Sequence, residues 1–423
     1  MIRLLRIAAL LAALAAGVVA AVRLLRSPRG SLVATPSPEA RDVPVGGAGM
    51  KRWLFGIAGL FAVFGFGGAL VAVSGIIPIK ASSGHWAITR WFLNFSKERS
   101  VATHTLGLEA PSLDDPGLVL KGAGHYDTGC RPCHGNPALP QPQIAWKMTP
   151  PPPYLPPRIS EWQPDELFYI VKHGIKFTGM PAWPSLQRDD EVWAMVAFLR
   201  RFPELDAAEY RRLTQGEAAP SGEVAQLPDL EGPERVPRAI TTSCARCHGV
   251  DGLGRGLGAF PKLAGQTPAY LDLSLQAFAR GTRHSGIMQP VAAGLSWEEM
   301  GELARYYASL QEPSPSPPHQ EATSAIERGK AIASRGIPSQ RVPSCADCHG
   351  PGATRRNPVY PELAGQYADY LALQLELFKK NVRGGTDYAH IMRRAAAGLT
   401  REQMRDVALY YASLPAATAP PTR

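Results

Sequence analysis

The sequence predicts three small domains in tandem behind an N-terminal membrane-spanning helix, with an amphipathic helix at the end of each domain. Three observations lead to this prediction. A run of 27 residues without a charged side chain extends from Trp53 to Ile79. All six cysteines fall into three Cys-x-x-Cys-His motifs, and the regions around two of these motifs repeat each other. With 423 residues, 45% of them hydrophobic, the chain can bury a separate core in each domain.

The uncharged run predicts a transmembrane anchor over residues 50–80, because it is long enough to cross about 30 Å of hydrocarbon. It is also rich in the Gly and Ala that membrane helices favour. The formal charge of +9 agrees, since residues 1–109 carry a net +8 and residues 110–423 only +1. Basic residues around an apolar segment signal membrane topology rather than a nucleic-acid-binding face. We therefore expect lipid and no nucleic acid as a partner.

Two further segments flank the anchor. Residues 81–110 carry aromatic side chains that suit a membrane interface, so we expect a short amphipathic anchoring helix there, with a partner-docking or quinol-proximal surface as the alternative. These aromatic residues are Trp86, Trp91, Phe92 and Phe95. The basic and apolar leader, residues 1–49, contains a second apolar stretch from Ile7 to Val22. Either this stretch is a first membrane segment, or Met50 is the true start and the leader is not translated; we favour the second interpretation.

The three domains are predicted at residues 111–210, 222–312 and 320–415. The second and third share an order of motifs that implies duplication. The second reads CARCHG, FPKLAGQTPAYL, Met288 and ARYYASL, and the third reads CADCHG, YPELAGQYADYL, Met392 and ALYYASL. The first has the same order with different residues. Pro- and Gly-rich linkers are expected at 218–237 and 313–318. The short second linker favours docking of the last two domains, and the longer stretch 206–237 leaves the first domain freer.

The helix that ends each repeat has a capping box at its start, Ser296 with Glu299 and Thr400 with Gln403. Apolar residues then recur at helical spacing. Met195, Met300 and Met404 lie on these helices, and we expect them to be core residues rather than metal ligands.

The Cys-x-x-Cys-His motif carries the chemistry. Two thiols three positions apart can each add to a vinyl group of one haem, and the adjacent histidine then lies under the iron. A zinc half-site would not use every cysteine in three copies, and a redox dithiol would not explain the histidines. We therefore predict three covalent c-type haems. The expected haem-binding residues are Cys130, Cys133, His134, Cys244, Cys247, His248, Cys345, Cys348 and His349.

A second ligand on each iron is expected from the loop before the last helix. Met180, Met288 and Met392 lie 46, 40 and 43 residues beyond their histidines, and a thioether suits haem iron. Metal ligation is thus assigned to His134, Met180, His248, Met288, His349 and Met392. The competing ligands are Met148, His173, His284 and His390, and the choice between His390 and Met392 is the least clear.

A proximal histidine needs an acceptor for its other ring nitrogen. Prolines lie in the right region of each domain. Pro261 and Pro361 occupy matched positions in the two repeats, and one residue of the run Pro150–Pro153 serves in the first domain. We expect their carbonyls to accept these hydrogen bonds.

These motifs resemble the class I c-type cytochromes. Residues 235–415 look like the dihaem c-four cytochromes, through C-A-x-C-H-G, P-x-L-A-G-Q-x-x-x-Y-L and the closing A-x-Y-Y-A-S-L. Residues 115–205 are similar to the single-haem domains of oxidase and dehydrogenase subunits, through C-x-x-C-H-G and G-M-P-A-W. The resemblance implies an all-α fold with crossing terminal helices. One departure is the short sequence before Cys244, which leaves little room for an N-terminal helix in the second domain.

The resemblance also implies a place and a role. Haem of this type is attached outside the bacterial cytoplasmic membrane, so the anchor runs outward and the haem domains lie in the periplasm; a cleaved signal peptide before it would reverse this topology. We expect an electron-transfer protein of a respiratory chain, not an enzyme and without a small-molecule substrate. Its partners are a dehydrogenase or quinol-oxidising complex and a terminal oxidase or soluble acceptor. A cytochrome subunit of a dehydrogenase is the alternative, and a multihaem peroxidase is disfavoured by the three methionines.

Overall fold

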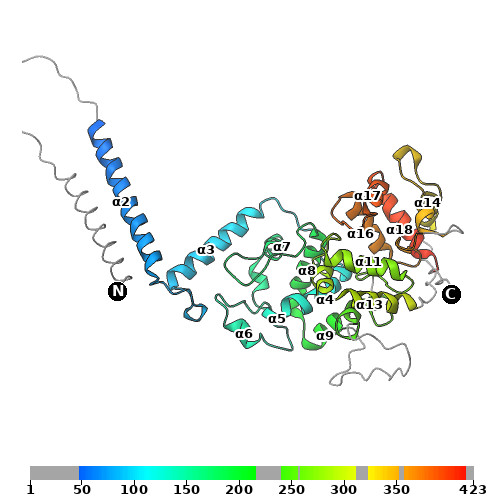
Figure 1. Cartoon of the computed structure of the whole chain (residues 1–423), viewed down its shortest axis with the longest axis horizontal. Coiled ribbons are helices and arrows are strands. Elements are labelled where there is room, and N and C mark those ends of the chain that lie inside the picture. The colour runs from blue at the N-terminus through cyan, green and yellow to red at the C-terminus, as the bar shows by residue number, and fades with distance from the viewer. Residues whose placement is uncertain (1–46, 216–239, 256–257, 311–322, 352–356, 416–423) are drawn as a thin grey trace, which may run out of the picture. The chain divides into compact units, whose positions relative to one another are not determined.

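The computed structural model describes residues 47–215, 240–255, 258–310, 323–351 and 357–415. Every regular element in these ranges is a helix, and strand-like pairing is limited to two isolated bridges. The all-α fold is therefore confirmed. The chain divides into two units, residues 1–84 and 85–423. Most of the predicted leader and both proline-rich linker segments lie outside the described residues (Figure 1).

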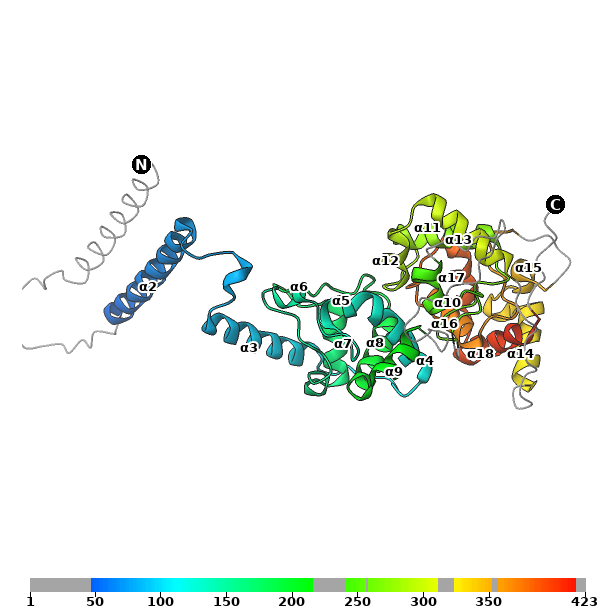
Figure 2. The same cartoon turned by 90° about the horizontal axis from the view of Figure 1, so that it is seen from below.

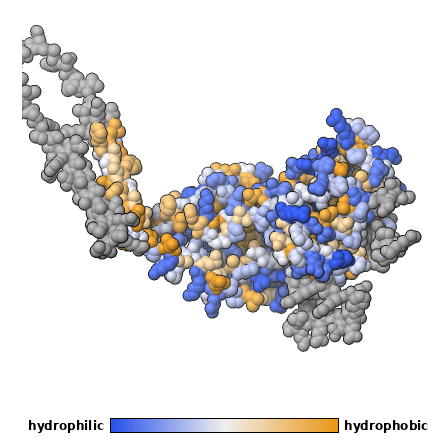
Figure 3. Space-filling view, viewed as in Figure 1, coloured by the Kyte–Doolittle hydropathy of each residue, from blue (hydrophilic) through white to orange (hydrophobic). Residues whose placement is uncertain are grey.

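The first unit contains α2 (Gly47–Ser74) and a short 3-10 turn at Ala81–Ser83. Within the part of the chain that the structure describes, α2 is the one helix long and apolar enough to cross a membrane, over Trp53–Ser74 with a mean hydropathy of 2.2. Its surface is apolar on the side shown in Figure 3. The helix ends five residues before the uncharged run does. Gly75 has a φ of +66° there, and Pro78 follows, so both residues interrupt a helix.

The second unit begins with α3 (Ala87–His104), the helix predicted from the aromatic segment. Its first half exposes large side chains, since Trp86, Trp91, Phe92 and Phe95 all lie open to solvent. Trp91 and Phe95 stack on each other, with ring centroids 5.7 Å apart. The C-terminal half turns inward, since Val101 is buried.

The first domain is held together by α4 crossing α8, with α9 packed beside α4 (Figures 1 and 2). A Cβ at Gly122 in α4 would collide with the backbone of Ala194 in α8, so the helices cross in contact. Tyr126, Phe198 and Tyr210 form the aromatic core. The elements are α4 Pro116–His125, a π-turn Tyr126–Cys130, α5 Arg131–His134, α6 Gln143–Trp146, a 3-10 turn Ile159–Glu161, α7 Pro164–His173, α8 Asp189–Arg201, a 3-10 turn Phe202–Glu204 and α9 Ala207–Gln215. Helix α9 carries this domain beyond the predicted end at residue 210.

The second and third domains repeat one architecture. Both have a short motif helix, a long helix, a distal-loop helix and a closing helix; the third adds an N-terminal helix that has no counterpart in the described part of the second, which starts at residue 240. The second contains a π-turn Ile240–Cys244, α10 Ala245–His248, α11 Pro268–Ala279, α12 Met288–Ala293 and α13 Trp297–Ser309. The third contains α14 Thr323–Arg335, a 3-10 turn Pro338–Gln340, α15 Ala346–His349, α16 Ala368–Lys379, α17 Ala389–Ala397 and α18 Arg401–Ser413.

The details expected of the closing helices are confirmed. Helices α13 and α18 each begin with a complete capping box, at Ser296 and Thr400. The three methionines on the closing helices are at most 2% exposed and belong to the core; they are Met195, Met300 and Met404.

The last two domains face each other with two-fold-like symmetry. The Gln266 side chain donates to the Glu362 carbonyl (2.7 Å) and accepts from the Glu362 N–H (3.1 Å). Gln366 makes the same pair of hydrogen bonds to Lys262, at 3.0 and 3.1 Å. This reciprocal pattern is that of an isologous interface. The docking expected for these domains is confirmed.

The freer first domain expected from the sequence is wrong. Residues 207–215 form α9, with Tyr210 and Thr214 buried in the first domain. The Arg255 guanidinium of the second domain donates to the carbonyls of Arg212 and Leu213, at 2.8 and 3.1 Å. The first domain is therefore fastened to the second at the end of α9.

Gly329 in α14 provides the first prediction. A Cβ there would collide with the Asp406 carbonyl of α18, and backbone cannot move aside as a side chain can. Gly329→Ala is expected to destabilise the third domain by about 2 kcal/mol. Hydrogen exchange of α14 and α18 would then speed up by about 30-fold.

Gly301→Ala in α13 is the control, because a Cβ there meets only the Arg305 guanidinium at 3.4 Å. Exchange in α13 should be unchanged or slower, since alanine favours a helix over glycine by roughly 0.5–1 kcal/mol. Equal exchange rates in the Gly329→Ala variant and the unaltered chain would contradict the close helix crossing.

Candidate haem-binding site

Each Cys-x-x-Cys-His motif forms the same short helix, α5, α10 or α15, which ends at the glycine after the histidine. Gly135, Gly249 and Gly350 have φ values of +70°, +74° and +72°, a region that favours glycine. The glycine ends the helix directly after the histidine, so the two cysteines and the histidine of each motif stay together on one short helical turn.

The proximal histidines have the partners expected of them. The Nδ1 atoms of His134, His248 and His349 lie 2.9, 3.0 and 2.9 Å from proline carbonyl oxygens. A carbonyl only accepts, so each Nδ1 carries the proton and each Nε2 is the unprotonated nitrogen. The three acceptors are Pro153, Pro261 and Pro361, and the prediction is confirmed with Pro153 as the member of the first-domain run. Burial also lowers the pKa of His134 and His248, which favours the neutral ring.

A tyrosine hydroxyl supports each motif, and the sequence reasoning missed it. Tyr307 and Tyr411, on the closing helices, donate to the carbonyls of Gly249 (3.1 Å) and Gly350 (2.7 Å). In the first domain Tyr126 donates to Gly135 at 2.8 Å, although it precedes the motif instead of following it. The repeated Tyr-Tyr of the closing helices was the available signal, but tyrosines at helical spacing look like ordinary core.

Several motif cysteines lie in surroundings that disfavour the thiolate form. Burial raises the pKa of Cys130 to about 12 and those of Cys244 and Cys345 to about 11. A redox-active dithiol needs a lowered pKa to supply thiolate. The environment therefore argues against the dithiol interpretation.

One cavity of about 850 Å³ is lined mostly by residues of the second and third domains, with a few from the first. Its lining includes His248, Met288, His349 and Met392, together with the four motif cysteines of the last two domains. Its other walls are mostly apolar side chains such as Leu271, Leu303 and Val407. A cofactor site of this kind has apolar walls and a few placed polar groups. The residues present therefore fit covalently bound haem.

The competing histidines lie elsewhere. His390 lines a different pocket with Arg394, and its Nδ1 lies 2.7 Å from the Asp387 carbonyl. His284 uses its Nδ1 to bond the Val382 carbonyl at 2.8 Å. His173 is exposed at the end of α7. None of the three histidines is among the residues that line the shared cavity.

The first domain keeps two candidate methionines. Met180, in the loop after α7, and Met148, just after α6, are both half-buried. A Cβ added to Gly179 would collide with the Met148 methyl group, so Met148 lies directly beside the Met180 segment. Both remain candidate ligands on these observations.

Two family models match the chain. The model of cbb3-type cytochrome c oxidase subunit III matches residues 117–199, and the cytochrome c model matches residues 234–311 and 326–415. The thiosulfate dehydrogenase electron acceptor of Thiomonas intermedia is 36% identical over 173 residues, which are 41% of this chain and 79% of that protein. Cytochrome c4 of Thiocapsa roseopersicina is 34% identical over 195 residues, 46% of this chain and 98% of that protein.

One of the similar solved structures is also a cytochrome c4. Reduced cytochrome c4 from Pseudomonas stutzeri covers 42% of this chain and 95% of its own, with 30% identity and a TM-score of 0.38. The chain belongs to the class I c-type cytochromes. Its domains are of the kind that binds haem c covalently, and it is an electron-transfer protein related to cytochrome c4 and to the thiosulfate dehydrogenase electron acceptor.

Replacement of Met392 provides the second prediction. Because Met392 lines the cavity with His349, Met392→Ala should alter the visible spectrum of one haem and lower its midpoint potential by on the order of 100 mV. His390→Ala, two residues away, is the control and should leave the spectrum and the potentials unchanged. The reverse pattern, with only the His390 variant affected, would assign this ligand to the histidine.

Proposed function

We propose that this chain is a membrane-anchored triheme electron carrier of the periplasmic side of the bacterial inner membrane. In each domain the two motif cysteines and the motif histidine would hold one haem; the histidines are His134, His248 and His349. Met180, Met288 and Met392 complete the iron coordination. Haem iron supplies the exchange of single electrons, and no substrate is bound or converted.

The observation that carries this proposal is the threefold repetition of one site geometry. In every domain a proline carbonyl holds the histidine Nδ1 at about 3 Å, and a tyrosine hydroxyl holds the end of the motif helix. The hydrogen bond from Nδ1 fixes the orientation of the ring and raises the basicity of Nε2 as a ligand. A methionine as the second protein ligand would leave no open coordination position, which suits electron transfer rather than peroxidase chemistry.

The length and the exposure of helix α2 support a membrane anchor. Helix α2 is long and apolar enough to span the hydrocarbon layer, and none of its spanning residues is buried in the protein. The exposed aromatic residues of α3 suit the interfacial layer, where Trp and Phe side chains gather. The haem domains would then stay beside the membrane, within reach of a dehydrogenase or quinol-oxidising complex and of a terminal oxidase or soluble acceptor.

A second candidate follows from the relatives. The similarity to thiosulfate dehydrogenase electron acceptors favours a cytochrome that takes electrons from a separate catalytic dehydrogenase, with thiosulfate oxidation as the first reaction to test. The two candidates differ in the donor alone.

The haem content provides the third prediction. The purified chain should contain three haems, and the double replacement Cys345→Ala/Cys348→Ala should leave two, because those thiols would form the only covalent links in the third domain. Iron analysis and a haem-stained gel measure both numbers. Fewer than three haems in the unaltered chain would disprove the site assignments.

The donor provides the fourth prediction. If the chain accepts electrons from a thiosulfate dehydrogenase, catalytic amounts of that enzyme with thiosulfate should reduce it much faster than thiosulfate alone. A stopped-flow record of haem reduction gives both rates. Equal rates would remove this candidate and leave another dehydrogenase or a quinol-oxidising complex as the donor; membrane vesicles with a quinol are the assay for the latter.

A further inference from the structure

The two-fold-like arrangement gives the Cys-x-x-Cys-His motifs of the second and third domains equivalent positions. In the described part of the chain, the first domain contacts the motif of the second domain. A Cβ at Gly124, in α4 of the first domain, would lie 3.3 Å from Cys247 Sγ and 3.0 Å from the Phe260 ring. Cys247 is one of the two attachment cysteines of the second domain. The first domain therefore lies directly against the attachment edge of its neighbour.

An ion pair crosses the same boundary. Arg246, between the two cysteines of the second motif, pairs with Asp127 of the first domain. Asp127 is only 4% exposed and also accepts a hydrogen bond from the Tyr210 hydroxyl at 2.8 Å. Arg131 pairs with the same carboxylate at 3.0 Å. The charge partner of Arg246 is thus held in place by the first domain's own core.

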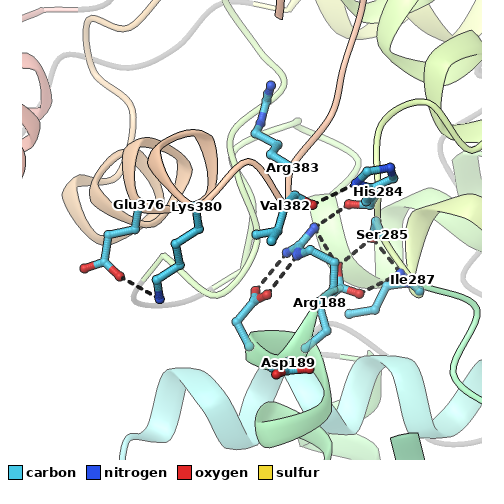
Figure 4. A network of polar contacts seen from close by, with 12 residues as sticks. Arg188, Asp189, His284, Ser285, Ile287, Glu376, Lys380, Val382 and Arg383 are labelled. Atoms are coloured by element: carbon cyan, nitrogen blue, oxygen red, sulfur yellow. Dashed lines mark hydrogen bonds and ion pairs between the residues drawn. The ribbon is translucent and has the colours of Figure 1, made fainter. Parts of the chain in front are cut away.

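A second polar joint fixes the segment that leads to Met288. Glu191, 3% exposed, accepts from the Ser285 hydroxyl and from the Gly286 N–H, both at 2.6 Å. Arg188 donates to the His284 carbonyl at 2.6 Å (Figure 4). Separating the two domains would leave these buried polar groups without their hydrogen-bond partners, so the docked arrangement is strongly favoured.

The third domain holds this segment from the other side. The His284 N–H donates to the Arg383 carbonyl at 2.7 Å, directly beside the Arg188 contact. The His284 ring donates its Nδ1–H to the Val382 carbonyl at 2.8 Å (Figure 4). Both hydrogen bonds join the second domain to the third. The residues before Met288 are therefore held between the first domain and the third.

Trp183 brings the two distal-ligand segments together. It follows Met180 by three residues, is 6% exposed, and donates its indole N–H to Glu191 at 3.3 Å. A Cβ on Gly286, two residues before Met288, would collide with the indole. The loop of Met180 and the loop of Met288 are consequently in direct contact.

The third domain lacks the features that the first domain uses. Asp347 stands at the position of Arg246, and it is exposed. Tyr360 replaces Phe260 and packs on Tyr388 of its own domain, with ring centroids 5.5 Å apart. A carboxylate at this position cannot pair with Asp127, so the first domain can distinguish the two repeats by charge.

We propose that the first domain is the built-in redox partner of the second domain. It docks beside Cys247, through the ion pair between Asp127 and Arg246 and the hydrogen bond between Glu191 and Ser285. One electron then passes directly between the haems of these two domains and reaches the third domain afterwards. One iron is oxidised as the other is reduced, and no bond is formed or broken. This inference rests on the proposed function, in which each domain carries a haem.

The test uses the full chain and two variants, one on each side of the contact between the first and second domains. Arg246→Asp gives the second motif the sequence of the third, CADCH, so haem attachment should be retained while Asp127 is repelled. Gly124→Leu inserts a side chain toward Phe260 without changing a charge. Asp347→Arg, the reciprocal change in the third domain, is the matched control.

Two measurements report on the joint. Hydrogen exchange of residues 117–125 and 282–288 shows whether the domains are docked, without any redox step. Flash photoreduction followed by absorbance shows the concentration-independent phase of electron redistribution among the haems. We expect both joint variants to lower the docked fraction about tenfold or more, with faster exchange and a slower first-order phase. The control should match the unaltered chain in both.

Unchanged exchange and an unchanged first-order phase in Arg246→Asp and Gly124→Leu would overturn the docking proposal, as would an equal effect of Asp347→Arg. Failure of the proposed function would look different, because the unaltered chain would then contain fewer than three haems. Haem content and midpoint potentials are measured on every variant, so a loss of haem is separated from a loss of docking.

Discussion

The hydrogen bond from the histidine Nδ1 to a proline carbonyl is the contact around which each domain is organised. It joins two segments, the motif helix and the loop that follows it 12 to 19 residues later. It also selects the tautomer with an unprotonated Nε2, so one interaction sets both the loop position and the atom that would coordinate iron. A tyrosine hydroxyl also donates to the carbonyl of the glycine that follows each motif, and this hydrogen bond holds the end of the motif helix in place. The closing helix provides the tyrosine in the last two domains, as with Tyr411.

Features set by local chemistry could be predicted from the sequence. The capping boxes, the buried methionines of the closing helices and the proline acceptors all depend on residue type at short spacing, and the duplicated positions of Pro261 and Pro361 made the last of these visible. The end of α2 at Ser74 was missed because composition alone sets no helix boundary, although Gly75 and Pro78 mark one. The tyrosine contacts were missed because a core tyrosine and a hydrogen-bonding tyrosine have the same helical spacing.

Contacts between domains were the least predictable. Gln266 and Gln366 look like surface residues, yet each satisfies both polar groups of a backbone segment across the interface. Glu191 lies in the first turn of α8, where an acidic residue is expected for the helix dipole alone. Its burial becomes apparent only when Ser285 and Gly286 are seen opposite it. Partners separated by more than ninety residues leave no pattern in a single sequence.

Burying charges between domains contributes more to specificity than to stability. Taking Glu191 and Asp127 out of water costs free energy, which is offset only when each carboxylate makes all of its hydrogen bonds and ion pairs. These groups therefore favour one arrangement of the domains and penalise others. A purely apolar contact would accept either of two similar domains, because both repeats present the same motif helix. Duplication produces two equivalent faces, and a change of charge sign at one position, Arg246 against Asp347, is enough to make them different. The chain can thereby build an ordered series of three domains from only two kinds of unit.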